Sequence, residues 1–340
     1  MALSPSLRRT VSFAWISIIT VLIAVLAYHE RNNIIHAIPY LVQTNYAVLI
    51  VTGGCELVYF VLQAIAAKKL YRQYGVNAQL SAITGMLFHA TMLNEVIPTS
   101  GASGTAGFIF WGDRLGYGLR SSVAVSIWLS IVSYFTLIPA IIVCVRVLSI
   151  LKAGPQYVIW GSIKVAIGFV ALCTFLALLW LFYVKFRQRE TSGKTLHDGY
   201  IKQLVDKIQN RLHWYTKNEL RKEWKVITER PWHMITLWIL LFSIYPVRVI
   251  MLMLCFTALH HPIGLSIAIE AYSLTLLFSV VSFAPTTLGV VEVALTTTLG
   301  WFGVPLPLAL AGTLLYRIPS FWLPIPVGLM YQTWLVRQIH

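Results

Sequence analysis

The sequence has little charge and none of the common motifs of a soluble enzyme. Only 11% of its 340 residues are charged, whereas 58% are hydrophobic, and this balance excludes an ordinary soluble domain. It contains no GxxxxGK[ST] phosphate loop and no HExxH metal motif. We therefore expect no cofactor, no metal site and no ATP hydrolysis.

Cysteine is also scarce, and positive charge is in excess. The four cysteines lie in apolar runs without CxxC spacing, which predicts buried, inert thiols. The net charge of +14 favours basic cytoplasmic loops and contact with anionic lipid headgroups over binding of nucleic acid.

What the sequence has is long apolar runs, which are typical of membrane-spanning helices. The fold class that we predict is an all-α polytopic membrane protein, with one domain over residues 1–340 and about six full spans. The expected spans are 11–28, 46–67, 123–145, 165–184, 236–259 and 305–336. Two further regions, 80–112 and 265–304, are apolar but interrupted by proline and glycine.

The distribution of basic residues predicts how the interrupted regions meet the membrane. The segment 185–235 holds 12 Lys and Arg against 6 Asp and Glu, so we expect a cytoplasmic amphipathic connector. If 80–112 enters and leaves the membrane on the cytoplasmic side, 20 Lys and Arg lie in the cytoplasm and 4 lie outside the cell. The same count of membrane crossings makes 265–304 enter and leave from the outside. This predicts two re-entrant helical hairpins in an inverted repeat, with both termini cytoplasmic; two ordinary kinked helices are the alternative.

Ionisable residues inside spans are functional candidates, because each is costly there unless it is paired or hydrated. Arg248 and Arg317 fall near the middle of their runs, and their expected partners are Glu292 and either Glu95 or Glu270. These pairs either stabilise the bundle as salt bridges or release the arginines to bind an anionic headgroup. The ionisable residues within spans are Glu56, Glu95, Arg248, Glu270, Glu292 and Arg317.

The first interrupted region contains the stretch LNEVIPTSGASGTAG at 93–107. Its amide and carboxylate, Asn94 and Glu95, precede a break at Pro98 and the small residues Gly101 and Gly104. Non-helical backbone at membrane depth is tolerated only where protein or a water-filled cavity lines it. We expect this stretch to form half of a headgroup site, with Arg317 across from it.

The second interrupted region supplies the other half. Pro285 ends one half-helix, Gly289 allows close approach of the backbone, and Glu292 lies in the first turns of the next half-helix, where the positive helix end favours a carboxylate. Pro319, Pro324 and Pro326 should then kink the last helix just past Arg317.

These motifs resemble those of a known family. Pro285-x-x-x-Gly289-Val-x-Glu292, followed by Gly303-Val-Pro and Leu315-Tyr-Arg317, is similar to the C-terminal signature of the lysylphosphatidylglycerol synthase transmembrane-region family. Asn94-x-x-Ile-Pro98-x-x-Gly101-x-x-Gly104 resembles its first motif. The resemblance implies an integral membrane protein of the flippase type.

The sequence also departs from that family. Many free-standing members carry an acid and an arginine just after the first Pro-x-x-Gly, whereas this chain has Ala102-Ser103-Gly104. It resembles more closely the branch that includes aminoacyl-lipid flippases. No aminoacyl-transfer domain accompanies the spans, so we expect no lipid synthesis by this chain.

The function that we predict is that of a lipid translocase, not an enzyme, in the cell membrane. Its expected partners are membrane lipids with anionic headgroups; a lipid-modifying enzyme and a second copy of the chain are the candidate protein partners. The alternatives are an ion-coupled solute transporter, an intramembrane enzyme acting on a headgroup, and a non-catalytic partner of a lipid-modifying enzyme.

Overall fold

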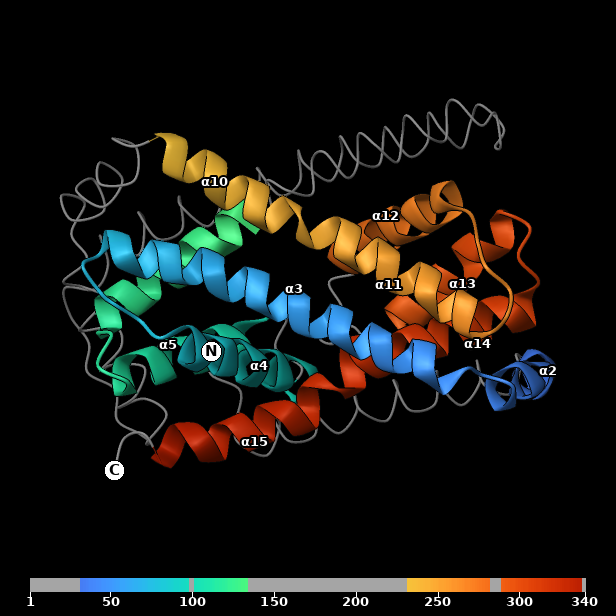
Figure 1. Cartoon of the computed structure of the whole chain (residues 1–340), viewed down its shortest axis with the longest axis horizontal. Coiled ribbons are helices and arrows are strands. Elements are labelled where there is room, and N and C mark those ends of the chain that lie inside the picture. Colours follow the sequence, from blue (N-terminus) through green and yellow to red (C-terminus); the bar gives the residue numbers. More distant parts are fainter. Residues whose placement is uncertain (1–30, 98–100, 134–230, 282–288, 338–340) are drawn as a thin grey trace, which may run out of the picture.

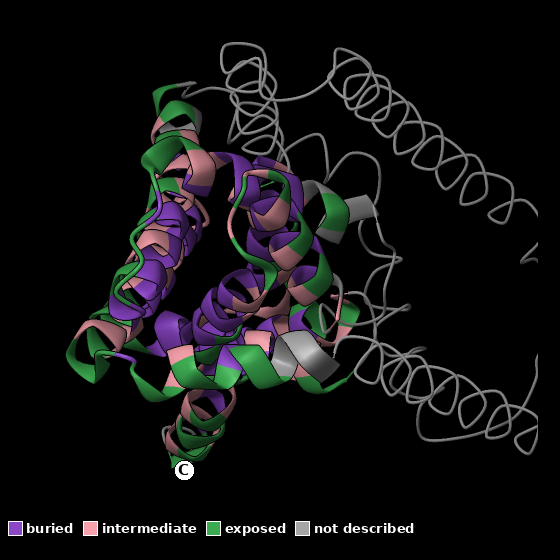
Figure 2. Cartoon of the chain, turned by 90° about the vertical axis from the view of Figure 1, so that its right-hand side faces the viewer, coloured by how far each residue is buried: buried purple, intermediate pink, exposed green. Residues whose placement is uncertain are grey.

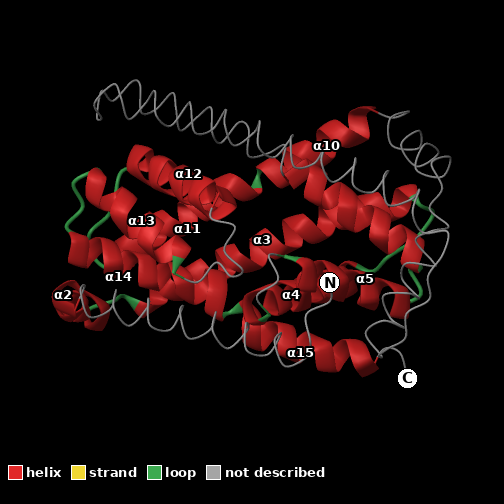
Figure 3. Ribbon diagram, turned by 180° about the vertical axis from the view of Figure 1, so that it is seen from behind, coloured by secondary structure: helices red, strands yellow, loops and turns green. Residues whose placement is uncertain are grey.

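The computed structural model describes residues 31–97, 101–133, 231–281 and 289–337. Over these residues the regular structure is entirely helical, as Figure 3 shows. Three helical stretches are long and apolar enough to cross a membrane, Tyr46–Gln73, Ile235–Ala258 and Leu306–Arg337. The chain is an integral membrane protein, as predicted. The expected spans 11–28 and 165–184, and most of the connector 185–235, lie outside the described residues.

The longest continuous helix of the described chain is α3, and the interrupted regions consist of shorter helices (Figure 1). A further helix covers Leu119–Ser133. The labelled elements are α2 (Arg31–Val42), α3 (Tyr46–Gln73), α4 (Leu80–Val96), α5 (Ala102–Arg114), α10 (Pro231–Phe242), α11 (Ile244–Ala258), α12 (Leu265–Val281), α13 (Val290–Trp301), α14 (Leu306–Arg317), the π-helical segment Ile318–Trp322 and α15 (Pro324–Arg337).

The first interrupted region is a helix pair that begins and ends at one end of the molecule, which we call the first end. The Tyr71 hydroxyl donates to Ser122 Oγ at 3.0 Å, and the backbone N–H of Gln79 donates to the Tyr117 hydroxyl at 3.2 Å. These bonds join the end of α3 to the start of the helix Leu119–Ser133, and the start of α4 to the loop after α5. Helices α4 and α5 therefore leave from and return to the same end.

The second interrupted region leaves from the opposite end, which we call the second end. There the backbone N–H of Asn45 donates to the carbonyl of Ala258 at 2.8 Å, and the rings of Tyr40 and His261 meet edge to face. Helix α12 starts from the loop after Ala258, and α14, which follows α13, packs against α2. The pair α12–α13 thus lies in the half of the molecule opposite to α4–α5 (Figure 1).

The described residues form two apolar cores, one around each pair. One core combines α4, α5, the helix Leu119–Ser133, α10 and α15 with the C-terminal half of α3, and the other combines α11 to α14 with α2. Buried residues line the inward faces of these helices in Figure 2. Helix α15 packs closely against α4, since a Cβ at Gly328 would stand 2.8 Å from Met92 Cβ and 2.9 Å from the Phe88 carbonyl oxygen. No larger residue fits there without a shift of the backbone.

One expected span differs from the prediction in its continuity. The run 236–259 is divided at Ser243, between α10 and α11. Pro246, in the first turn of α11, explains the division, because proline has no N–H to donate and its ring collides with the carbonyl of the preceding turn. The two helices still follow one another, and Ile235–Ala258 is long and apolar enough to cross a membrane.

Candidate functional site

Arg248 on α11 and Glu56 on α3 form a bidentate ion pair in the interior. The Arg248 Nη1 atom lies 2.5 Å from Glu56 Oε2, and Nη2 lies 3.0 Å from Oε1. The Glu56 side chain is fully buried, and that of Arg248 is 11% exposed. The guanidinium carbon also stands 3.8 Å above the centre of the Tyr59 ring. Two parallel hydrogen bonds and an aromatic face satisfy this arginine almost completely.

The partner predicted for Arg248 was wrong. Glu292, Glu95 and Glu270 were the expected carboxylates, and the structure places Glu56 there instead. Measured at 1.5 Å per residue, Glu56 and Arg248 each lie about 25 Å along their helices from Gln73 and Pro231, which are at the same end of the molecule. Equal depth on antiparallel helices is the signal in the sequence that could have identified this pair.

Arg317 at the end of α14 pairs with Glu292 on α13. The Arg317 Nε atom donates to Glu292 Oε1 at 2.6 Å, and the guanidinium carbon lies 4.5 Å from the centre of the Phe321 ring. The Arg317 side chain is 7% exposed and that of Glu292 is 21% exposed. The structure therefore brings together two of the residues that the sequence singled out.

Glu292 also caps the N-terminus of its own helix, α13. Its Oε2 atom accepts the backbone N–H of Gly289 at 2.6 Å. In a capping box, this is the bond from the N-cap backbone to the side chain of the third helical residue. Gly289 has a φ of 83°, and glycine adopts this conformation at no steric cost. Each oxygen of the Glu292 carboxylate thus has its own partner. Pro285 lies outside the described residues.

The backbone beside Arg317 departs from α-helical geometry. Residues Ile318–Trp322 form a π-helical turn, in which the N–H of Leu323 donates to the carbonyl of Ile318 at 2.9 Å. Pro319 lies in this turn and has no N–H for the α-helical ladder. The proline-rich stretch was expected to kink the last helix, and the helix is interrupted at this point, between α14 and α15. Such turns occur frequently at functional sites.

We group the two ion pairs under one name, the paired-arginine cluster (Glu56, Arg248, Glu292 and Arg317). The group that connects them is Tyr316, next to Arg317 on α14, which interacts electrostatically with both arginines. The hydroxyls of Tyr59 and Tyr272 are also within electrostatic range of Arg248. The cluster is therefore a buried region with two guanidinium groups, two carboxylates and several tyrosines. Groups of this kind can recognise an anion.

The tip of the first helix pair is held together by Asn94. Its Oδ1 atom accepts the backbone N–H of Gly104 at 2.7 Å, and Ser103 Oγ donates to the carbonyl of Leu93 at 3.0 Å. Gly104 is the third residue of α5, so this bond satisfies an N–H that the helix itself leaves unpaired. A Cβ at Gly104 would collide with Asn94 and with the Ala90 carbonyl.

The conformation of the same tip explains Gly101. This residue precedes α5 with a φ of 90°, a conformation that only glycine adopts readily. Glu95 is half-buried near the end of α4, and Pro98 lies outside the described residues. The bonds of Asn94 to Gly104 and Ser103 stay within the helix pair, so a common headgroup site with Arg317 stays a prediction.

Glu270 on α12 forms no ion pair with either arginine of the cluster in the described chain. The residue is 0% exposed, and neither of its carboxylate oxygens has a hydrogen-bond partner in the part of the chain that the structure describes. Glu270 was expected to pair with an arginine. For Arg248 this expectation is wrong, because Arg248 pairs with Glu56. Within the described ranges, no group of three His, Cys, Asp or Glu side chains could hold a metal ion.

Comparison with known families adds one finding. The family model described as lysylphosphatidylglycerol synthase TM region matches residues 10–328, which is nearly the whole chain. The matched range includes both interrupted regions and the paired-arginine cluster. Neither a curated protein nor a solved structure matches the chain.

Proposed function

The chain belongs to the lysylphosphatidylglycerol synthase TM region family, and on this premise we propose that it is a lipid translocase. It would move a lipid with an anionic or aminoacyl-modified headgroup between the two leaflets of the cell membrane. The family is associated with flippases of membrane lipids, and the apolar helices are those of an integral membrane protein.

The observation that carries the proposal is the paired-arginine cluster. A guanidinium group inside a membrane protein is expensive and is retained where it has a function. Arg317 is only 7% exposed, and its counterion Glu292 is on the second helix pair. A phosphate-bearing headgroup offers a guanidinium the same oxygen geometry as a carboxylate. It can therefore take the place of Glu292 at Arg317.

The helix pairs support a path for the headgroup. Helices α4 and α5 start from and return to the first end, and α12 and α13 do so at the second end. We interpret them as re-entrant hairpins that enter the membrane from opposite sides, as in inverted-repeat transporters. Their interrupted backbones would give the headgroup polar contacts, while the acyl chains stay in the surrounding lipid.

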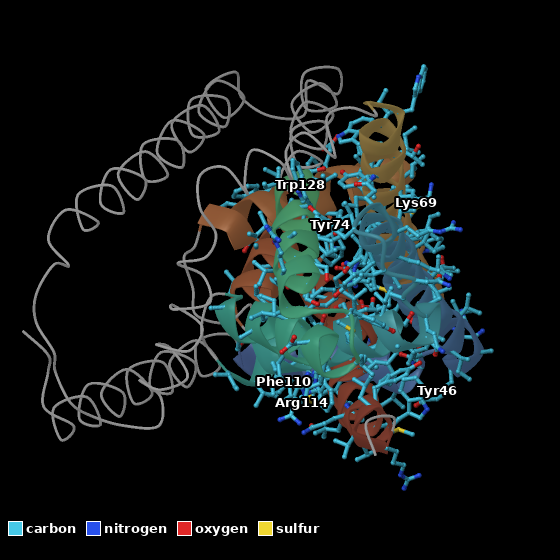
Figure 4. All side chains as sticks on the ribbon, turned by 90° about the vertical axis from the view of Figure 1, so that its left-hand side faces the viewer. Tyr46, Lys69, Tyr74, Phe110, Arg114 and Trp128 are labelled. Carbon is cyan, nitrogen blue, oxygen red and sulfur yellow. The ribbon has the colours of Figure 1, made fainter. Side chains whose placement is uncertain are left out.

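The first end is the one that we assign to the cytoplasm, because basic side chains gather there. Lys69 and Arg114 are seen from this side in Figure 4. Loops rich in Lys and Arg remain cytoplasmic. The basic residues of the described chain at this end are Lys68, Lys69, Arg72, Arg114, Arg120 and Arg337.

Labelling from one side checks this orientation. In a background without the four native cysteines, Asn77→Cys in the α3–α4 loop should react with a membrane-impermeant maleimide only from the cytoplasmic side. Ser266→Cys, at the start of α12, should react only from outside, and both positions are exposed. Labelling of Asn77→Cys only from outside and of Ser266→Cys only from the cytoplasm would show that the chain has the opposite orientation.

Translocation itself can be measured in reconstituted vesicles. Purified full-length chain is placed in liposomes that carry a fluorescent phosphatidylglycerol or phosphatidylcholine, and a membrane-impermeant quencher is added outside. Vesicles with protein should lose fluorescence from both leaflets, faster for the anionic lipid, because the phosphate of an anionic headgroup can replace Glu292 at Arg317. Vesicles without protein should lose only the outer-leaflet signal.

Two outcomes would contradict the proposal. One is a protein-containing vesicle that behaves like an empty one. The other is loss of inner-leaflet fluorescence together with leakage of a trapped soluble dye, which would mean that the bilayer is damaged. Retention of the inner-leaflet signal together with uptake of a small anion would favour the solute-transporter alternative.

A further inference from the structure

Glu270 is a buried carboxyl group that has no counterion among the residues that the structure describes. Each of its two oxygens is almost inaccessible to solvent, and neither has a hydrogen-bond partner among the described residues. An ionised carboxylate in such surroundings is strongly disfavoured, and the group takes up a proton instead. Unsatisfied buried groups are rare in proteins, and one of them calls for a functional explanation.

The charged groups on the neighbouring helices are already engaged. Helix α12 packs against α13 and α11. On α13, Glu292 is bound to Arg317, and on α11, Arg248 is bound to Glu56. The Tyr245 hydroxyl is bonded to Ser273 Oγ and to the carbonyl of Ile269 at 3.2 Å. The other titratable groups of these helices are Cys255 on α11 and Tyr272 on α12 itself.

We propose that Glu270 is a proton-binding site that couples movement of the α12–α13 pair to the protonation of its carboxyl. In the conformation described, the carboxyl is enclosed and holds its proton. When the pair moves and water reaches Glu270, the O–H bond breaks, the proton passes to water and a carboxylate remains. The same carboxyl takes a proton up again before the site closes.

The position of Glu270 gives the proton a short path to water. The residue lies about 8 Å along α12 from Leu265 at 1.5 Å per residue. Leu265 and Ser266 are exposed, as are the neighbouring loop residues His261 and Pro262. Exchange would therefore occur with the aqueous phase at the second end. If lipid movement is proton-coupled, which rests on the proposed function, that phase is the one outside the cell.

Infrared spectroscopy tests the proton site without any transport assay. Difference spectra of the full chain in lipid nanodiscs, recorded as the pH is raised, should contain a C=O band from a protonated buried carboxyl. Glu270→Gln should abolish this band, and Glu270→Asp should shift it. Asp113→Asn removes an exposed carboxyl at the first end and should leave it unchanged.

Coupling is tested in the reconstituted vesicles. A pH difference of one unit across the membrane should shift the steady-state leaflet ratio of the labelled lipid by up to about tenfold, if one proton moves with each lipid. In Glu270→Gln the ratio should not respond to the pH difference. A response to a sodium gradient at equal pH, and none to pH, would overturn the proposal in favour of a metal cation.

The two experiments separate the two proposals. A buried carboxyl band that stays at the same position in both Glu270→Gln and Glu270→Asp overturns the proton site, whatever the transport result. If Glu270→Gln does not fold, as judged by gel filtration, the band shift of Glu270→Asp decides. If the wild type moves no lipid but shows the Glu270 band, the translocase proposal fails and the proton site stands.

Discussion

Replacing Glu56 with alanine is expected to lower the free energy of unfolding by about 3–5 kcal/mol. The loss is large because Arg248 stays buried with neither of its two hydrogen bonds to the carboxylate. A buried charge without its counterion costs more than the pair contributed. Denaturation of the detergent-solubilised chain, followed by tryptophan fluorescence, measures this quantity.

Two further variants separate the charge from the packing. Glu56→Gln keeps the shape and one oxygen acceptor, so its loss should be smaller than that of Glu56→Ala. Glu56→Leu combined with Arg248→Met removes both charges and should recover most of the stability, as happens when buried ion pairs are replaced by apolar residues. A Glu56→Ala variant within about 0.5 kcal/mol of the wild type, the range of neutral surface substitutions, would show that the pair does not stabilise the bundle.

Replacing Arg317 with alanine is expected to slow lipid translocation by about tenfold or more. A hydrogen bond to a charged group contributes about 1.5–3 kcal/mol, and 1.4 kcal/mol corresponds to a factor of ten. Arg317→Lys should lie between alanine and the wild type, because lysine keeps the charge but not the planar fork. Arg337→Ala is the matched control, since it removes an exposed arginine at the end of α15. An Arg317→Ala variant as fast as Arg337→Ala would exclude Arg317 from the path of the headgroup.

A double-mutant cycle shows whether Glu292 and Arg317 act as a unit. Glu292→Gln removes the charge but can preserve the helix cap, because glutamine serves at this capping-box position as well as glutamate does. We expect the effects of Glu292→Gln and Arg317→Ala to be non-additive by about 0.5–3 kcal/mol, as for residues in direct contact. Simple additivity would mean that the 2.6 Å bond between them has no part in transport.

The helical fold could be predicted from the sequence because its signals are local. Apolar runs predicted the spans 46–67 and 236–259, and the structure has α3 and α10–α11 there. Proline and glycine predicted a break at Pro98, and in the structure α4 ends at Val96 and α5 begins at Ala102. The depth of each helix pair in the membrane depends on the bilayer, and it remains a prediction from the charge count.

The pairing of charges was harder to predict, because it depends on how the helices are rotated about their axes. Glu292 and Arg317 lie on helices joined by a short turn, and the sequence brought them together correctly. Glu56 and Arg248 are 192 residues apart, and no local pattern connects α3 with α11. Asn94 was selected for its polarity, but the bonds to Gly104 and Ser103 make it part of the hairpin tip.

Under the proposed function, the divided carboxylate of Glu292 would let Arg317 exchange one anion for another. One carboxylate oxygen caps α13 through Gly289, and the other neutralises Arg317. An incoming anion can displace the second oxygen while the first keeps its bond, so the resident counterion stays tethered and ready to return. Under the proposed function, loading and release of a headgroup are then a swap of one anion for another, and the helix cap remains intact throughout.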